Sequence, residues 1–154
     1  VIAKYPAGKI AFSDGLMYSA VDTVTIRVRG VATHGASPHL GNDPVVVGSQ
    51  IVLALQNIVT REISPIEPAL ITVGAFHAGS APNVISDEAR LELTVRANSE
   101  ATRKTLLRSI ERVAINTARA AGKAVTVVTL PVGHHQMTET PDATLFAIRD
   151  FLAA

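Results

Sequence analysis

Two histidines lie in a short glycine-flanked segment, Gly30-Val-Ala-Thr-His34-Gly-Ala-Ser-Pro-His39, which follows an alternating strand pattern. A histidine at a strand end is well placed for chemistry, because loops on a rigid scaffold carry function. His34 can donate a hydrogen bond to a developing oxyanion or to a substrate carboxylate. For His39 the simpler interpretation is that it caps or packs at the entry of the next helix. The spacing of the two histidines differs from that of metal ligands paired on one helix.

Two further polar residues near the ends of predicted strands can bind a substrate. Asn83 follows Pro82 in a loop of small residues. Its amide either closes an Asx-turn on its own backbone or binds a substrate carbonyl or carboxylate. Arg96 ends a predicted strand, where its guanidinium is either solvated or binds a carboxylate through two hydrogen bonds.

The other titratable residues favour structural roles. His77 is expected at an interface on an edge strand, and His134-His135 in a surface loop, because no carboxylate or cysteine lies at metal spacing. Asp87-Glu88 is typical of a turn. The remaining aspartates considered are expected in turns or caps: Asp14, Asp22 and Asp43. With no cysteine, phosphate loop or nucleophile elbow, we expect this chain to bind no metal and to hold no complete hydrolytic centre.

The composition is that of one globular domain. The chain has 154 residues, of which 47% are hydrophobic and 18% charged, and its formal net charge is +1. That balance gives no reason to expect nucleic acid or a membrane as partner, and no apolar run approaches the ~18 residues of a membrane span. The absence of cysteine suits a cytoplasmic protein. The chain begins at Val1 and stops inside a helical pattern opened by Thr140-Pro141-Asp142, so we expect an excised domain.

Hydrophobic periodicity predicts four strands, over residues 21–29, 70–78, 89–96 and 125–130. Two helices are expected between them. Asp43 caps the first, which ends near Arg61, and Ser99 caps the second, which ends at Gly122. The expected core stripe of the first helix is Val47, Ile51, Leu55 and Ile58. The expected core stripe of the second is Leu106, Ile110, Val113 and Thr117.

The order β-α-β-β-α-β predicts an α+β fold of the ferredoxin-like type, in which two helices cover one face of a four-stranded antiparallel sheet. Right-handed crossovers place the first and third strands centrally and leave the second and fourth as edges. The edge strand over 70–78 is a template for pairing with another chain.

Three segments, taken in their order and spacing, resemble one family. They are Ser19-Ala-Val-Asp22 with the His34 segment and Asn42-Asp43-Pro44, then Gly79-Ser-Ala-Pro-Asn83-Val-Ile85, then Thr94-Val-Arg96. They are similar to the lid, or dimerization, domain of the aminoacylase, hippurate hydrolase and carboxypeptidase G family of two-metal peptidases and amidohydrolases. The similarity is greatest to the branch that hydrolyses N-acyl amino acids.

Two departures from the family pattern bear on the branch rather than on the family. Ser86 stands where members often have proline after the Asn-Val-Ile run. The pair that often introduces the last helix is Asn-Asp, and this chain has Thr140-Pro141-Asp142.

The resemblance implies a catalytic domain that binds two zinc ions or other divalent metals and carries the lid as an insertion. Residues 1–18 would then be a linker or strand remnant of that domain, 19–132 the lid, and 133–154 a truncated return segment. Such lids form homodimers through the sheet edge. His34 matches the histidine that reaches the partner subunit's active site and polarises the scissile carbonyl, and Asn83 and Arg96 match residues that bind the substrate's carboxylate.

Three functions follow from these observations. The resemblance favours the lid of an enzyme that cleaves small N-acyl amino acids or peptides, with the isolated chain inactive. A stand-alone ferredoxin-like small-molecule-binding or regulatory module is the alternative, because this fold hosts many functions. A domain whose only role is dimerization is the third.

Overall fold

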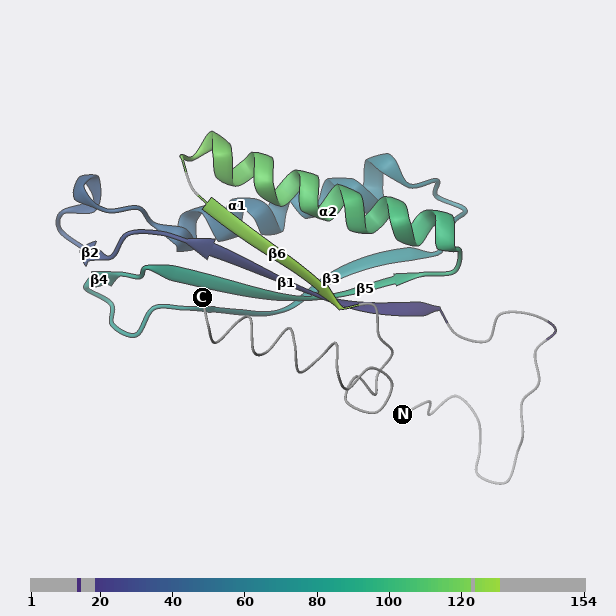
Figure 1. The fold of residues 1–154 in the computed structure, drawn as a ribbon, viewed down its shortest axis with the longest axis horizontal. Helices are drawn as coiled ribbons and strands as arrows, with labels where there is room; N and C mark the ends of the chain where they lie inside the picture. The colour runs from purple at the N-terminus through teal and green to yellow at the C-terminus, as the bar shows by residue number, and fades with distance from the viewer. Residues whose placement is uncertain (1–13, 15–18, 123, 131–154) are drawn as a thin grey trace, which may run out of the picture.

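The computed structural model describes residues 14, 19–122 and 124–130, the last of these by their backbone alone. Two helices lie on one face of an antiparallel sheet, in a two-layer arrangement (Figure 1). Three predictions fall outside the described residues. They are the linker over 1–18 apart from Asp14, the His134-His135 loop, and the return segment 133–154 with the helix opened by Thr140-Pro141-Asp142.

The main sheet contains the four strands that periodicity predicts. They are β1 (Ala20–Arg29), β3 (Ala69–Ala78), β5 (Glu88–Ala97) and β6 (Ala124–Leu130). Their order across the sheet is β3-β5-β1-β6, and all three pairings are antiparallel. β3 therefore lies at one edge, with a register shift between Val73 and Ala75. A second, two-stranded sheet, β2-β4, was not predicted.

Both predicted helices form, and both predicted caps are confirmed. α1 (Pro44–Asn57) continues into the π-helical turn η2 (Ile58–Glu62), and α2 spans Glu100–Ala120. Asp43 accepts hydrogen bonds from the first backbone N–H groups of α1, and Ser99 accepts one at the start of α2. Gly122, with a φ of 69°, follows the last turn of α2. α1 packs on β3 and β5, while α2 packs on β5 and β6.

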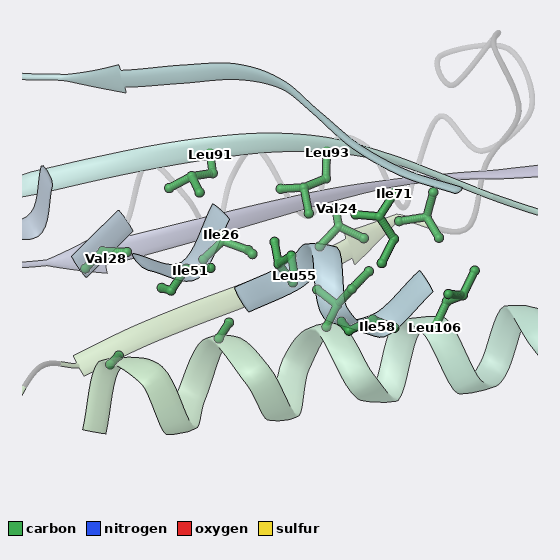
Figure 2. Close-up of a cluster of buried hydrophobic side chains, with 14 of the residues drawn as sticks. Val24, Ile26, Val28, Ile51, Leu55, Ile58, Ile71, Leu91, Leu93 and Leu106 are labelled. Atoms are coloured by element: carbon green, nitrogen blue, oxygen red, sulfur yellow. The ribbon is translucent and has the colours of Figure 1, made fainter. Parts of the chain in front are cut away.

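The core lies between the helices and the sheet (Figure 2). The predicted stripe of α1 is confirmed, as is the buried side of β1. In α2 the buried stripe continues from Ile110 to Ala114 and Ala118, whereas the predicted Val113 and Thr117 are half-buried. Positions four residues apart share one helix face, so the buried stripe continues in steps of i+4. Alanines occupy its last two positions.

Two charged residues of β1 correct the predictions. Asp22 lies within β1, on the buried side and only 1% exposed, so it is neither a turn nor a cap residue. Its carboxylate accepts two hydrogen bonds from Arg103 of α2, both 2.7 Å long. Arg27, placed by the alternation on the polar side, is also buried, and its Nη1 lies 3.7 Å from Oε2 of Glu88. Glu88 thus begins β5, and only Asp87 lies in a bend.

Candidate functional site

His34 lies in a short strand rather than in an open loop. Thr33–His34 form β2, which pairs antiparallel with β4 (Val84–Ile85), and His34 lies opposite Val84. This two-stranded ribbon lies beyond the end of the main sheet where β1 finishes and β5 begins (Figure 1). It joins two segments that are distant in the sequence. The prediction of a loop is wrong because the backbone of each segment finds its hydrogen-bond partners on the other.

Close backbone contacts fix the ribbon to the sheet. The N–H of Gly30 donates to the carbonyl of Asp87 over 2.6 Å, and Val31 pairs with Asn42 through two hydrogen bonds of 3.0 and 2.9 Å. A Cβ at Gly30 would lie 2.1 Å from the carbonyl oxygen of Asn42, so only glycine fits there. These contacts hold the segment before His34 against the segment that leads into α1.

The imidazole of His34 is held as a hydrogen-bond donor. The backbone N–H of Ala36 donates to Nδ1 of His34 over 3.1 Å, so Nδ1 carries a lone pair. In a neutral imidazole the proton then resides on Nε2. Because His34 is exposed, this Nε2–H is accessible to a group outside the chain. An oriented donor of this kind can polarise a carbonyl oxygen.

Asn83 lies at the same end of the molecule as His34. Its backbone carbonyl accepts a 2.8 Å hydrogen bond from the N–H of Gly35, and its side chain is exposed. The structure therefore brings His34 and Asn83 together. A hollow of about 690 Å³ lies beside them, between the ribbon, the 79–82 loop and the start of α1. Its lining mixes polar and apolar side chains and includes Pro38, Asp43, Val45, Ser80, Val84 and Ser86.

Arg96 lies at the opposite end of the sheet. It pairs with Val21 of β1 and Leu70 of β3, whereas the ribbon lies near Glu88. At about 3.3 Å per residue, the length of β5 between Glu88 and Arg96 is about 26 Å. Since successive side chains alternate and the neighbouring Val95 is buried against the helices, Arg96 belongs to the other face of the sheet. One chain alone does not bring Arg96 to His34 and Asn83.

The remaining candidates lie apart from this pair. His39 is exposed in the short 3-10 helix η1 (Pro38–Leu40), and Asp43 caps α1 in its place, so the prediction that His39 caps or packs at the helix entry is wrong. His77 is exposed on the edge strand β3, and its role at an interface stays a prediction. Across residues 14, 19–122 and 124–130, no three metal-ligating side chains cluster. Within the same ranges no helix has the length and apolar character needed to cross a membrane.

Two N-acetyldiaminopimelate deacetylases are among the relatives of this chain in sequence. The Bacillus licheniformis protein is 34% identical over 155 residues, which cover 99% of this chain and 39% of that protein. The Bacillus subtilis protein is 37% identical over 147 residues, which cover 94% and 38%. The chain thus spans about two fifths of the length of these curated relatives.

Solved structures share the fold. A protein of methicillin-resistant Staphylococcus aureus, assigned as an aminohydrolase, superposes with a TM-score of 0.71 at 34% identity, over 73% of this chain and 30% of that one. Bacillus subtilis YXEP, described as a dinuclear metal binding peptidase from the M20 family, gives a TM-score of 0.59 over 88% of this chain and 34% of that one. At 23% identity the second likeness concerns the fold alone.

The elements from β1 to the end of α2 span the range of residues that a family model matches. The model of the M20 peptidase dimerisation domain matches residues 20–121. This range contains the ribbon, both helices and the strands β3 and β5. The chain belongs to the M20 family of peptidase dimerisation domains.

Proposed function

We propose that this chain is the dimerisation domain of a metal-dependent amidohydrolase that cleaves the amide bond of N-acyl amino acids or peptides. The observation that carries the proposal is the exposed imidazole of His34, which is oriented by the hydrogen bond from Ala36 to its Nδ1 on a ribbon beyond the end of the sheet. The two deacetylases among the relatives support this substrate class. The family match favours this function over a stand-alone regulatory module.

The domain proposed here is ferredoxin-like and spans residues 19–132, with 1–18 and 133–154 leading to a catalytic domain of the same chain. The strand order β3-β5-β1-β6 and the two helices on one face support that fold. In such an enzyme we expect the catalytic domain to hold two zinc or other divalent ions, and no three ligating side chains cluster among the residues described for this domain. We place the enzyme in the cytoplasm.

A homodimer formed at the edge strand β3 explains why Arg96 lies far from His34. Two-fold pairing of β3 with β3 of a second copy runs the strands antiparallel, so opposite ends of the two sheets become neighbours. Arg96 of one subunit would then lie at the end where the second subunit carries His34 and Asn83. A complete substrate site would take His34 and Asn83 from one subunit and Arg96 from the other.

Each residue has a distinct role in this arrangement. His34 donates its Nε2–H to the oxygen of the scissile carbonyl, where negative charge develops. Arg96 binds the substrate carboxylate, for which its planar guanidinium is suited. Asn83 contributes an amide beside His34. In the full-length enzyme, replacing His34 by alanine should lower kcat by about 10²–10³. His34→Gln, which can place an amide N–H near the position of Nε2, should retain more activity than His34→Asn.

Mixed dimers test which subunit supplies each residue. Co-expressed His34→Ala and Arg96→Ala subunits should regain about a quarter of the wild-type activity, because half of the randomly assembled dimers contain one intact site. His34→Ala mixed with Asn83→Ala should regain nothing, since the same subunit supplies both residues to each site. Recovery in the second mixture but not in the first would contradict the proposed assignment. A His34→Ala enzyme with undiminished kcat would contradict the catalytic role.

A further inference from the structure

The hollow beside His34 and Asn83 has the dimensions of a small-molecule site. Its volume of about 690 Å³ lies within the range of about 300–1,000 Å³ that is usual for such sites. Its walls come from the ribbon, from the end of β3 with the loop that follows it, and from the start of α1. None of the described side chains that line it is aromatic or larger than that of isoleucine. These short side chains leave room for a bulky group.

The lining of the hollow contains a single charged residue among those that the structure describes. This residue is Asp43, and its carboxylate already accepts the backbone N–H of Val45 over 2.9 Å. The hydroxyl of Ser86 is likewise engaged, because it donates to the carbonyl of Glu88 over 2.8 Å. Beside them, Val45 and Val84 are 40% and 47% exposed. Such a lining suits an uncharged, partly apolar group, and the carboxylate of Asp43 disfavours an anionic one.

The hollow and the imidazole of His34 lie on the same side of the ribbon. His34 is opposite Val84 in the β2-β4 pair, and directly opposite residues of an antiparallel pair share one face. Val84 lines the hollow, and so does Gly35, the residue after His34. A carbonyl group that accepts a hydrogen bond from Nε2 of His34 therefore has the hollow beside it.

The two ends of an N-acyl amino acid point away from each other at the scissile amide. The acyl group and the carbon that carries the carboxylate lie trans across the planar amide. In the proposed homodimer, Arg96 of one subunit binds the carboxylate, while His34 belongs to the other subunit. The carboxylate end is thus directed toward the subunit that supplies Arg96. The acyl end remains beside the subunit that supplies His34 and the hollow.

We infer that the hollow binds the acyl group of the substrate, and that it accepts a bulky, uncharged acyl group and disfavours an anionic one. The inference rests on the proposed function and adds the class of acyl group to it. Ala81, an exposed residue in the loop wall of the hollow, limits the size of that group. Asp43 limits its charge.

Bulk introduced at Ala81 tests the size of the acyl group in the full-length enzyme. N-acetylalanine, N-benzoylalanine and N-acetylphenylalanine enlarge the acyl group and the amino-acid side chain separately. Ala81→Trp should lower kcat/KM for N-benzoylalanine relative to N-acetylalanine by about tenfold or more. The same ratio for N-acetylphenylalanine should stay unchanged. Asn116→Trp, on the exposed side of α2, is the matched control and should change neither ratio.

The outcomes separate this inference from the function on which it rests. A wild-type enzyme that hydrolyses none of the three substrates would overturn both. A wild-type enzyme that hydrolyses N-acetylalanine but not N-benzoylalanine would overturn the inference alone. The same holds if Ala81→Trp keeps both ratios, or if it lowers only the ratio for N-acetylphenylalanine. Circular dichroism checks that both variants fold.

Removal of the charge of Asp43 tests the preference for an uncharged acyl group. Asp43→Asn keeps a good N-cap residue for α1 but carries no negative charge. It should raise kcat/KM for N-succinylalanine relative to N-butyrylalanine several-fold, because the succinyl group carries a carboxylate where the butyryl chain ends in a methyl group. Glu111→Gln removes an exposed carboxylate from α2 and should leave that ratio unchanged. Equal changes in the two variants would overturn the placement of the acyl group beside Asp43.

Discussion

The two helices of this domain both bury an apolar stripe on the same sheet face, but only α2 adds ion pairs to that packing. α1 has no charged side chain, and its buried face is an apolar stripe from Val47 to Ile58. α2 carries charged residues along its length and is joined to the rest of the fold by ion pairs at both Asp22 and Glu62. The difference indicates that apolar packing alone positions α1, whereas α2 combines apolar packing with ion pairs.

The ion pairs of α2 anchor it to two separate elements. Arg103, in its first turn, binds Asp22 of β1, and Arg112 binds Glu62 of η2 over 2.6 Å. The hydrogen bonds that Arg103 donates to the carboxylate of Asp22 raise the pKa of Arg103, which therefore remains charged throughout the accessible pH range. These ion pairs help to fix the position of α2, whose outer side is polar. Removing the buried ion pair between Arg103 and Asp22 should give the largest loss of stability.

Asp22→Ala should cost about 3 kcal/mol of unfolding free energy, because it leaves the charge of Arg103 without its buried partner. Glu100→Ala is the matched control, since Glu100 binds the same guanidinium over 3.1 Å but has a 59% exposed side chain. The control should cost less than about 1 kcal/mol. Urea denaturation measures both values. Equal losses for the two variants would show that burial does not govern the anchoring of α2.

Asp22 also shows what the sequence could and could not reveal. Its position, in phase with Val24 and Ile26, already placed it on the buried side of the strand, so that signal was present. Its partner Arg103 is 81 residues away, and no local pattern connects the two. The strands and helices were predictable because their apolar periods extend over several turns or residue pairs. The caps were predictable because Asp43 and Ser99 act on their nearest neighbours.

Such patterns do not predict the ribbon, and they predict the separation of the site residues only in part. β2 and β4 each contain two residues, too few for any alternation to be visible. Their pairing arises from the closure of two distant loops, on which the donor orientation of His34 also depends. The distance between Arg96 and Asn83, by contrast, follows from the predicted strands, because β5 separates the two residues. The sequence of one chain does not show the proposed second copy, which would bring Arg96 and Asn83 to one site.

A matched pair of cap substitutions should give an effect of intermediate size. Asp43→Ala and Ser99→Ala each remove the acceptor that binds the first N–H groups of a helix, and each should cost about 1 kcal/mol. The loss at Asp43 should shrink as salt is added, because a carboxylate at a helix N-terminus also interacts with the helix dipole. The loss at Ser99 should not depend on salt. Thermal unfolding at low and high ionic strength distinguishes the two, and identical salt responses would contradict the assignment.

The smallest expected effect is at Glu62, where η2 meets α2. Hydrogen bonds from Arg112 and Ser109 lower the pKa of the Glu62 carboxyl below its ordinary value of 4.5. A lowered pKa in the folded state means that the stabilisation is present above pH 4.5 and is lost as the pH falls through the lower, folded value. Glu62→Gln should therefore cost only a fraction of about 1 kcal/mol at neutral pH, because the pair is exposed.

The pH dependence of that small loss provides the decisive measurement. The difference in unfolding free energy between wild type and Glu62→Gln should narrow steadily as the pH is lowered below 4.5, because the wild-type carboxyl then takes up a proton. High salt should also reduce this difference in unfolding free energy at neutral pH. A difference that stays constant with both pH and salt would mean that Glu62 holds α2 by packing alone. The two helices would then differ less in how they are anchored than their charges indicate.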